Sequence, residues 1–253
     1  MKIKHPGAEN ISSLKALWNE AFGDAYEDID LFFKTAFDTG RSLCVLDNER
    51  AVAALYWFDC EYRDEKVAYL YAIATLKSYR GRGLCRKLMD EAHSILKKAG
   101  YVCVILVPGE KSLFDFYGKM GYRVFSLVDE KHIAASYQKI ELKRIDSLEY
   151  GRIRRGLLPE NSVIQEKECL DYLGAYAELY KGEGILCACV RNGDSVRITE
   201  LLGNTSYGGG IVYALGCKTG LVRAAGDSRE FSMYLPLCEK KIDTFAYFGL
   251  AFD

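Results

Sequence analysis

The sequence predicts an α/β fold with a mixed sheet (an α+β arrangement), followed by a second half that resembles a weaker copy of the first. Three observations support this prediction. Helical and strand-like hydrophobic periods alternate along the chain, hairpin signals stand beside a helical crossover, and part of the element order recurs about 143 residues later. Strands joined both by hairpins and by a crossover helix form a mixed sheet rather than a doubly wound parallel one.

The first half opens with a short strand and two amphipathic helices, which end near Gly23 and Gly40. Three strands follow, and a polar turn joins the first two as a hairpin. The clearest helix comes next, with an apolar stripe spaced by three and four residues and Gly100 just after its end. A strand, a short helix and another strand complete this half. The predicted ranges are 2–4, 9–22, 26–37, 42–46, 51–62, 67–76, 84–99, 101–107, 110–120 and 122–128.

The second half repeats part of this order. Asp146 and Glu149 form a capping box for a helix, and Asn192-Gly193 is a strong hairpin signal. The pair Leu43-Cys44 in the first half matches Leu186-Cys187 in the second. The predicted ranges are strands 138–144, 185–190, 195–202 and 244–253, and helices 151–158 and 168–180. We therefore expect one domain over residues 1–130 and a degenerate copy over 131–253.

Composition excludes several classes of function. Thirty-four basic and 35 acidic side chains leave a net charge of −1, which argues against charge-driven binding to nucleic acid or to an anionic membrane. The longest apolar run, residues 51–58, is far shorter than the roughly 20 residues that a membrane helix needs. The first residues lack the apolar stretch of a secretory signal. These features predict a cytoplasmic protein.

The cysteine and histidine pattern predicts neither disulfides nor a metal. Nine cysteines are an odd number, and those in apolar, strand-like segments suit free thiols in a reducing compartment. The three histidines are far apart in sequence. Cys187 and Cys189 form a C-x-C pair without a second pair at zinc spacing. A serine hydrolase is unsupported because the chain has no G-x-S-x-G segment.

The most informative segment is the sharp turn between a strand and the clearest helix. It reads Arg80-Gly81-Arg82-Gly83-Leu84-Cys85, and we call it the glycine loop. Glycines let a backbone approach a ligand closely, and the free N–H groups at a helix start favour an anion. Nearby arginine and lysine side chains add positive charge, so the segment is suited to a diphosphate. The simpler alternative is a basic turn before an amphipathic helix.

A second segment favours the diphosphate-binding interpretation of the glycine loop over the basic turn. Residues 113–122 read Leu-Phe-Asp-Phe-Tyr-Gly-Lys-Met-Gly-Tyr, with a Phe116-Tyr117 pair ahead of Gly121-Tyr122. Together with the glycine loop, in the same order and at the expected spacing, it resembles the GCN5-related N-acetyltransferase (GNAT) family. The resemblance covers about residues 1–128. Proteins with two GNAT units in tandem exist, which agrees with the weak second copy.

The resemblance implies roles for particular residues. Backbone amides of Arg80, Gly81, Arg82, Gly83, Leu84 and Cys85 would hold the pyrophosphate of acetyl-CoA, the co-substrate. The backbone of Ile73, Ala74 and Thr75 would pair with the pantetheine arm, and one N–H would polarise the thioester carbonyl. Tyr117 would protonate the departing thiolate while an amine attacks directly. The alternative for Tyr117 is a core residue, because it lies on the apolar face of its helix.

Two departures and one gap accompany the resemblance. Cys85 stands where the family prefers Gly or Ala, and Glu110 stands where many members carry an Asn. No carboxylate lies on the strand before the glycine loop, where many relatives place the general base. Asp59, Glu61, a water molecule and the terminal Asp253 remain alternatives for that base.

The acceptor is less constrained. The stretch between the first two helices is acidic, with Asp24, Glu27, Asp28 and Asp30, and could attract a cationic amine; the alternative is a solvated helix start. We expect an N-acetyltransferase that acts on a small-molecule or peptide amine. A non-catalytic acyl-CoA sensor is the alternative, and a nucleotide-binding domain is weaker because the P-loop Lys-Ser/Thr is missing. A homodimer is one option for its assembly.

Overall fold

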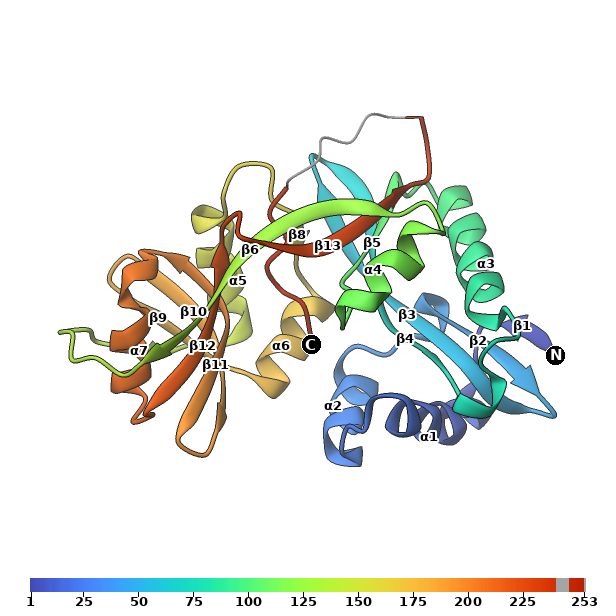
Figure 1. The fold of residues 1–253 in the computed structure, drawn as a ribbon, viewed down its shortest axis with the longest axis horizontal. Helices are drawn as coiled ribbons and strands as arrows, with labels where there is room; N and C mark the ends of the chain where they lie inside the picture. Colours follow the sequence, from blue (N-terminus) through green and yellow to red (C-terminus); the bar gives the residue numbers. More distant parts are fainter. Residues whose placement is uncertain (240–245, 253) are drawn as a thin grey trace. The chain divides into compact units, whose positions relative to one another are not determined.

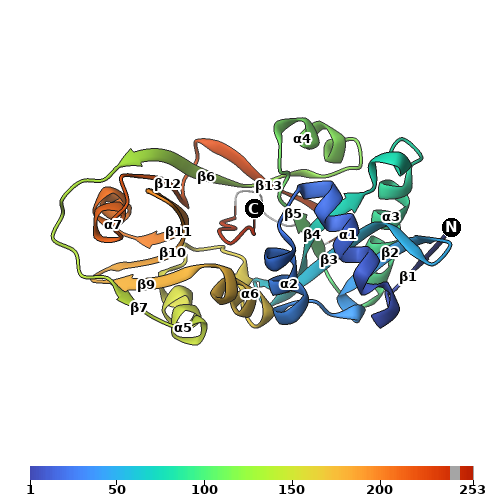
Figure 2. The ribbon, with the colours of Figure 1, turned by 90° about the horizontal axis from the view of Figure 1, so that it is seen from below.

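The computed structural model describes residues 1–239 and 246–252, which form two compact units. Among the described residues, the first unit comprises 1–106, 110–123 and 234–239, and the second comprises 107–109, 124–233 and 246–252. Each unit combines a mixed sheet with helices, as Figures 1 and 2 show. The predicted α/β class with a mixed sheet is therefore confirmed.

The sheet of the first unit has the order β1-β2-β3-β4-β5, with the end of β13 beside β5. Neighbours from β1 to β4 are antiparallel, whereas β4 and β5 are parallel. The strands are β1 (Lys2–Lys4), β2 (Ser42–Asp47), β3 (Arg50–Tyr62), β4 (Glu65–Thr75), β5 (Cys103–Leu106) and β13 (Arg229–Pro236). The parallel pair β4 and β5 requires a crossover, which the longest helix provides.

Helices α1 (Ile11–Phe22) and α2 (Tyr26–Thr35) cover one face of this sheet, and α3 (Leu84–Lys98) covers the other (Figures 1 and 2). Trp18 of α1 joins the first layer to the sheet. Its ring lies 5.0 Å from that of Phe32 in α2 and 5.5 Å from those of Tyr56 and Tyr71 in β3 and β4. Such tilted aromatic pairs bury large apolar areas and fix the orientation of both helices.

Helix α3 follows the predicted stripe with one difference. Leu84, Leu88 and Ala92 of the predicted stripe are buried, but its last predicted member, Ala99, is exposed, and the last buried residue of the helix is Leu96. Ala99 is the C-cap residue, one position beyond the end of the helix at Lys98, so it no longer packs against the sheet. A short helix, α4 (Lys111–Gly118), follows β5.

The second unit has the strand order β13-β6-β12-β11-β10-β9-β7. From β6 to β7 the neighbours are antiparallel except β11 and β12, which are parallel. Its strands are β6 (Arg123–Ala134), β7 (Lys143–Arg144), β8 (Ile164–Gln165), β9 (Glu178–Gly182), β10 (Ile185–Asn192), β11 (Ser195–Gly203) and β12 (Thr219–Ala225). Its helices are α5 (Ser147–Leu157), α6 (Glu168–Tyr176) and α7 (Gly208–Ala214). One apolar cluster joins α7 to β10, β11 and β12.

Some local predictions for this unit are confirmed and others are wrong. The Asp146 side chain accepts the Glu149 N–H at 2.8 Å and caps α5. The predicted helix 168–180 instead ends at Tyr176, because the next residues pair with β10 as strand β9. The predicted strand 138–144 shrinks to β7. Of the predicted strand 244–253, the described residues 246–252 form one bridge, between Ser162 and Tyr247, and the remainder lies outside the described residues.

The element order of the first unit recurs in the second. The series β1, α1, α2, β2, β3, β4, α3, β5 corresponds to β7, α5, α6, β9, β10, β11, α7, β12. In both series the later helix connects a parallel pair of strands. By this topology β10 corresponds to β3, so the alignment of Leu43-Cys44 with Leu186-Cys187 is wrong: it places β2 against β10. Pairs of apolar residues are common in buried strands and do not fix the register of a repeat.

Candidate active site

The glycine loop connects β4 to α3, as the sequence predicts. Gly81 and Gly83 have φ of +75° and +73°, values that residues with a Cβ rarely adopt. Added Cβ atoms would meet nothing within 4 Å, so the glycines serve the backbone conformation rather than close packing. The N-cap residue of α3 is Gly83, which has no side chain to cap the helix. The first amides of a 15-residue helix are therefore available to an anionic ligand.

Hydrogen bonds hold the loop in place from both sides. The Tyr79 hydroxyl donates to Asp47 at the end of β2 (2.7 Å), and the Lys77 N–H donates to the Glu20 carboxylate of α1 (2.9 Å). The Arg82 guanidinium lies 4.8 Å from the centroid of the Tyr79 ring and also donates to the Ser78 carbonyl. These bonds tie the loop to β2 and α1 and so restrict its conformation.

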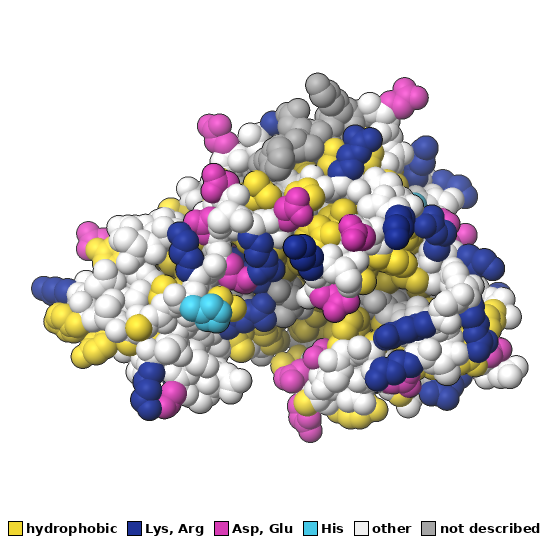
Figure 3. Space-filling view, viewed as in Figure 1, with side chains coloured by type: hydrophobic (Ala, Val, Ile, Leu, Met, Phe, Trp, Pro, Cys, Tyr) yellow, Lys and Arg dark blue, Asp and Glu magenta, His cyan; other side chains and the backbone are white. Residues whose placement is uncertain are grey.

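Basic side chains surround the same turn. Arg80, Arg82, Arg86 and Lys87 are exposed. In Figure 3, dark-blue side chains gather on the side where Figure 1 places α3. Arg80 and Arg86 also bond to backbone carbonyls, of Thr75 (3.1 Å) and Lys119 (3.3 Å). The charges therefore lie on a fixed framework near the helix start.

Strand β4 carries an irregularity that the sequence did not reveal. Ala72 has φ of +46°, and the β3–β4 register shifts there, so that two residues of β4 stand opposite Leu55. Such a bulge turns the following backbone groups in a new direction. A positive φ at alanine is uncommon and occurs where the surrounding structure enforces it, often at functional sites.

The pairing of β4 with β5 covers only Val67 to Tyr69. The predicted pantetheine-binding residues Ile73, Ala74 and Thr75 lie beyond it, after the bulge. In the described residues, the β4–β5 register stops at Tyr69, so the backbone groups of these three residues are not paired with β5. The Thr75 hydroxyl is buried, and no described residue bonds to it. An unpaired strand edge of this kind suits an extended, amide-containing chain.

Tyr117 lies in the last turn of α4 and is buried. Its ring contacts those of Phe116 and Tyr122, with centroids 5.2 and 5.7 Å away. Within the described part of the chain, no group forms a hydrogen bond with its hydroxyl. Burial, and secondarily the nearby Cys85 thiol, raise the pKa of Tyr117 well above its usual value. The phenol is therefore protonated at neutral pH and has a proton to donate.

The carboxylates considered as general base lie elsewhere or are already bonded. Asp59 stands opposite Ala68, near the start of β4, where it accepts a hydrogen bond from Tyr101 at 2.5 Å. Ala68 is four residues before the bulge, a separation of about 13 Å along a strand. Glu61, opposite Lys66, lies still farther away. Asp253 lies outside the described residues.

Part of the acidic stretch before α2 is used internally. Asp24 accepts a hydrogen bond from the Trp18 indole (2.8 Å), and Asp30 pairs with Lys15 (2.6 Å). Glu27 and Asp28 occupy the first turn of α2, where carboxylates stabilise the helix. The solvated helix start thus accounts for most of this charge. Glu110, at the start of α4, accepts from the Ser112 hydroxyl at 2.5 Å.

The corresponding helix start in the second unit is closed. Gln138 accepts the N–H of Gly210 (2.9 Å), and added Cβ atoms at Gly208, Gly209 and Gly210 would meet neighbouring atoms at 2.8 Å or less. Helix α7 has seven residues. Glycine here permits close packing, whereas in the glycine loop it leaves open space, so the two sites have different physical character.

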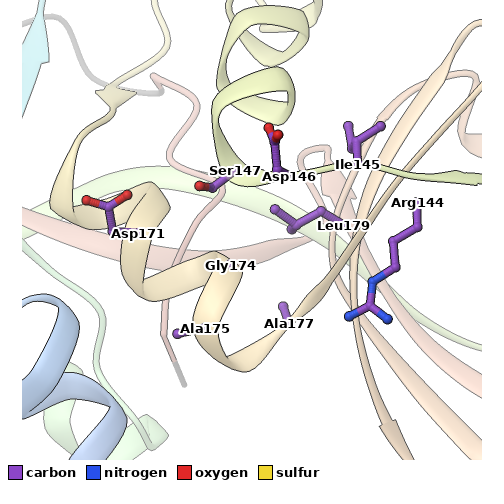
Figure 4. A pocket seen from close by; sticks show the side chains of 9 residues that line it. All are labelled: Arg144, Ile145, Asp146, Ser147, Asp171, Gly174, Ala175, Ala177 and Leu179. Atoms are coloured by element: carbon purple, nitrogen blue, oxygen red, sulfur yellow. The ribbon is translucent and has the colours of Figure 1, made fainter.

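The second unit holds a pocket of about 370 Å³, drawn in Figure 4. It lies among the start of α5, the end of α6 and β9, and its lining mixes small, apolar and charged residues. Asp146 already caps α5 there, and Arg144 pairs with Glu178 at 3.7 Å. Nothing at this pocket matches the chemistry of the glycine loop.

The described residues contain neither a cluster of metal ligands nor a membrane-spanning helix. Among residues 1–239 and 246–252, no three His, Cys, Asp or Glu side chains are grouped as metal ligands would be. No helix in the same residues is long and apolar enough to cross a membrane. All nine cysteines are free thiols, and seven of them are buried, as the sequence predicts.

Comparison with known proteins defines the class. A sequence profile of the acetyltransferase (GNAT) domain matches residues 2–125. A GCN5-related N-acetyltransferase from Anabaena variabilis has a TM-score of 0.73 and 14% identity, over 94% of this chain and 73% of that one. The corresponding protein from Kribbella flavida has a TM-score of 0.68 and 14% identity, over 92% and 70%.

A tandem GNAT protein from the clavulanic acid biosynthesis pathway has a TM-score of 0.59 and 11% identity, over 95% of this chain and 99% of that one. No curated protein sequence matches the chain significantly. At such low identity the solved structures show the fold, and the matched domain supplies the family. Residues 2–125, nearly all of which lie in the first unit, therefore form a GNAT acetyltransferase domain.

Proposed function

We propose that the chain is an acetyl-CoA-dependent N-acetyltransferase that acetylates a primary amine. The observation that carries the proposal is one arrangement in the first unit: an uncapped helix start on a basic glycine loop, with a buried, protonated tyrosine on the next helix. The loop and the first amides of α3 bind the diphosphate. Ile73, Ala74 and Thr75 hold the pantetheine arm through the unpaired edge of β4.

The reaction follows from these groups. The amine nitrogen attacks the thioester carbonyl, a C–N bond forms, and the C–S bond breaks. An N–H group near the bulge stabilises the negative charge that develops on the carbonyl oxygen. Tyr117 gives its proton to the departing thiolate, and a water molecule carries away the amine proton. The usual pKa of a phenol is about 10, and burial raises that of Tyr117 further, so proton transfer to the thiolate requires that the two be held in contact.

We propose the functional division 1–130 and 131–253, with the second part a GNAT-like half that binds no cofactor of its own. The closed start of α7 supports this division. The acceptor is a small-molecule or peptide amine.

The cofactor site is tested by calorimetric titration with acetyl-CoA. Gly83→Glu places a carboxylate at the uncapped helix start, and we expect binding to weaken by about tenfold or more through charge repulsion. Gly83→Gln is the matched control, because it imposes the same strain at φ +73° and a similar volume without the charge. Equal losses in both variants would mean that backbone strain, and not the diphosphate, explains the effect. Absence of binding to the unaltered protein would contradict the proposal.

The chemistry is tested by mass-spectrometric detection of acetylated products from a panel of amines. We expect Tyr117→Phe to lower kcat by about 100-fold or more while acetyl-CoA binding is retained, because the ring stays and only the proton donor is lost. Tyr101→Phe is the control, since this phenol bonds to Asp59 at the other end of the sheet. Tight acetyl-CoA binding without transfer to any amine would instead indicate an acyl-CoA sensor.

A further inference from the structure

Tyr122 touches the proposed acid residue in two ways. Its N–H donates to the Tyr117 carbonyl at 3.1 Å, and its ring lies 5.7 Å from the Tyr117 ring at an interplanar angle of 57°. Both rings are buried. A shift of Tyr122 would therefore move the backbone and the side chain of Tyr117 together.

The Tyr122 hydroxyl bonds in turn to helix α3. It lies 2.7 Å from Nε2 of His93, whose ring is 5.8 Å away. Burial lowers the pKa of His93 to about 4, against a smaller opposite effect of Asp90. Burial also raises the pKa of Tyr122. At neutral pH the bond therefore joins a phenol to an uncharged imidazole, and the tautomer of His93 decides which of the two donates. The other titratable groups that face Tyr122 are Tyr117, Cys85, Cys103 and Asp90.

The same helix begins at the glycine loop. His93 is the tenth residue of α3, about 15 Å along the axis from Gly83. One rigid element therefore bears the proposed diphosphate site at its first turn and the bonding partner of Tyr122 farther along. An apolar aromatic ring at position 122 would fill the same space, but it would lack this directional bond.

We propose that His93 and Tyr122 are positioning residues that fix Tyr117 relative to helix α3, and through it to the glycine loop. The role rests on the proposed function, because it places the proton donor against the thioester sulfur. Neither residue touches the reacting atoms. A loss of about 1 Å in the placement of Tyr117 is enough to slow proton transfer strongly.

The test compares Tyr122→Phe, His93→Leu and His93→Gln in the full chain. We expect the first two to lower kcat about tenfold, with the Kd for acetyl-CoA changed by less than about twofold. The glutamine amide can either donate to the Tyr122 hydroxyl or accept from it, so His93→Gln should retain most of kcat. The double variant His93→Leu/Tyr122→Phe should be no slower than either single variant, since both remove one bond. Tyr101→Phe controls for loss of a bonded phenol hydroxyl elsewhere in the unit.

A second measurement does not depend on turnover. Hydrogen exchange at the amides of Met120 and Tyr122, which both donate to the Tyr117 carbonyl, should quicken in Tyr122→Phe, while exchange in α1 stays the same. Equal kcat in wild type and Tyr122→Phe overturns the positioning role alone, and so does unchanged exchange at these amides. If His93→Gln lowers kcat as much as His93→Leu does, the positioning role is overturned as well. A wild-type protein that binds acetyl-CoA but transfers nothing overturns the proposed function first, before any variant is compared.

Discussion

Cys85 shows how a single departure from the family pattern is accommodated. Its Sγ lies 3.9 Å from Sδ of Met89, one helical turn later, so the side chain turns toward the apolar side of α3. Burial raises the pKa of this thiol to about 11. Although it lies at a helix start, where thiols are often reactive, the group is protonated at neutral pH. Its environment is that of a packing residue, which agrees with direct attack by an amine and no acyl-cysteine intermediate.

His93 should make stability depend on pH. Its pKa is lowered by burial to about 4 in the folded chain, against about 6.5 when exposed. Between these values the unfolded chain binds the proton more readily, so the free energy of unfolding falls as pH falls from about 6.5 to 4 and is unaffected above that window. We expect a loss of about 2 kcal/mol at pH 4.5 from this group. Urea unfolding at pH 7 and pH 4.5 measures it.

The matched variant is His93→Gln, which keeps a polar group and removes the titration. Between pH 7 and 4.5 its free energy of unfolding should fall by about 2 kcal/mol less than that of wild type. His132→Gln, at an exposed histidine of β6, should behave like wild type. An identical pH dependence in wild type and His93→Gln would show that the imidazole does not carry this effect.

At the scale of elements, the glycine loop is held by its neighbours rather than by its own sequence. Tyr79 bonds to the end of β2, and the Lys77 N–H bonds to α1. Two strands, two helices and the loop thus meet at one corner of the first unit, opposite the end where Asp59 lies. This arrangement explains why the loop alone, read as a motif, is a weak signal: its conformation depends on contacts with residues 20 and 47.

Much of the first unit could be predicted from sequence because its signals are local. The stripe of α3, the stop at Gly100 and the Arg-Gly pattern each lie within a few residues of the feature they predict. The bulge at Ala72 could not be predicted, since alanine at positive φ follows from tertiary pairing with β3. The bond between His93 and Tyr122 was missed because it joins residues 29 positions apart. The roles of the predicted site residues remain predictions.

In the second unit, the predictions that failed concern segments whose sequence pattern does not decide between helix and strand or disfavours the observed helix. Residues 177–182 contain no helix breaker before Gly182, so the helical period runs on from α6, yet pairing with β10 makes them a strand. Helix α7 opens with three glycines, which have low helix propensity, and it was not predicted. Packing of those glycines against residues 133–138 offsets that cost.

At the scale of the whole molecule, one element order occurs twice with different physical results. In the first unit the layer between α1 and the sheet is aromatic, formed by Trp18, Phe32 and Tyr56. In the second, α5 faces the sheet through a buried charge pair: Arg154 donates to both carboxylate oxygens of Glu200, at 2.8 and 3.0 Å. The start of α3 in the first unit is open, whereas the start of α7 in the second unit is closed. The two units therefore share an element order, while their cores and helix starts differ.

The buried pair in the second unit also binds the end of the described chain. Glu200 accepts hydroxyl hydrogen bonds from Tyr150 (2.8 Å) and Tyr247 (3.1 Å). Gln165 accepts from Arg154 and from the Leu250 N–H, and it donates to the Leu250 carbonyl at 2.6 Å. All these groups are buried. Residues 246–252 are thus part of the core of this unit.

This network predicts a large and local cost of breaking one charge. Glu200→Gln leaves the Arg154 guanidinium buried without a counter-charge, and we expect the second unit to lose about 3–5 kcal/mol of stability. Lys218 and Asp194 provide the matched control, a pair 2.5 Å apart whose side chains are 78% and 71% exposed; Asp194→Asn should cost less than about 1 kcal/mol. Because the two units need not unfold together, the measurement is hydrogen exchange at β10 and β11 amides rather than a single melting curve. Similar effects of the two substitutions would mean that the buried pair does not hold this core together. In that case the aromatic and apolar packing around Phe248 would have to carry the attachment of residues 246–252.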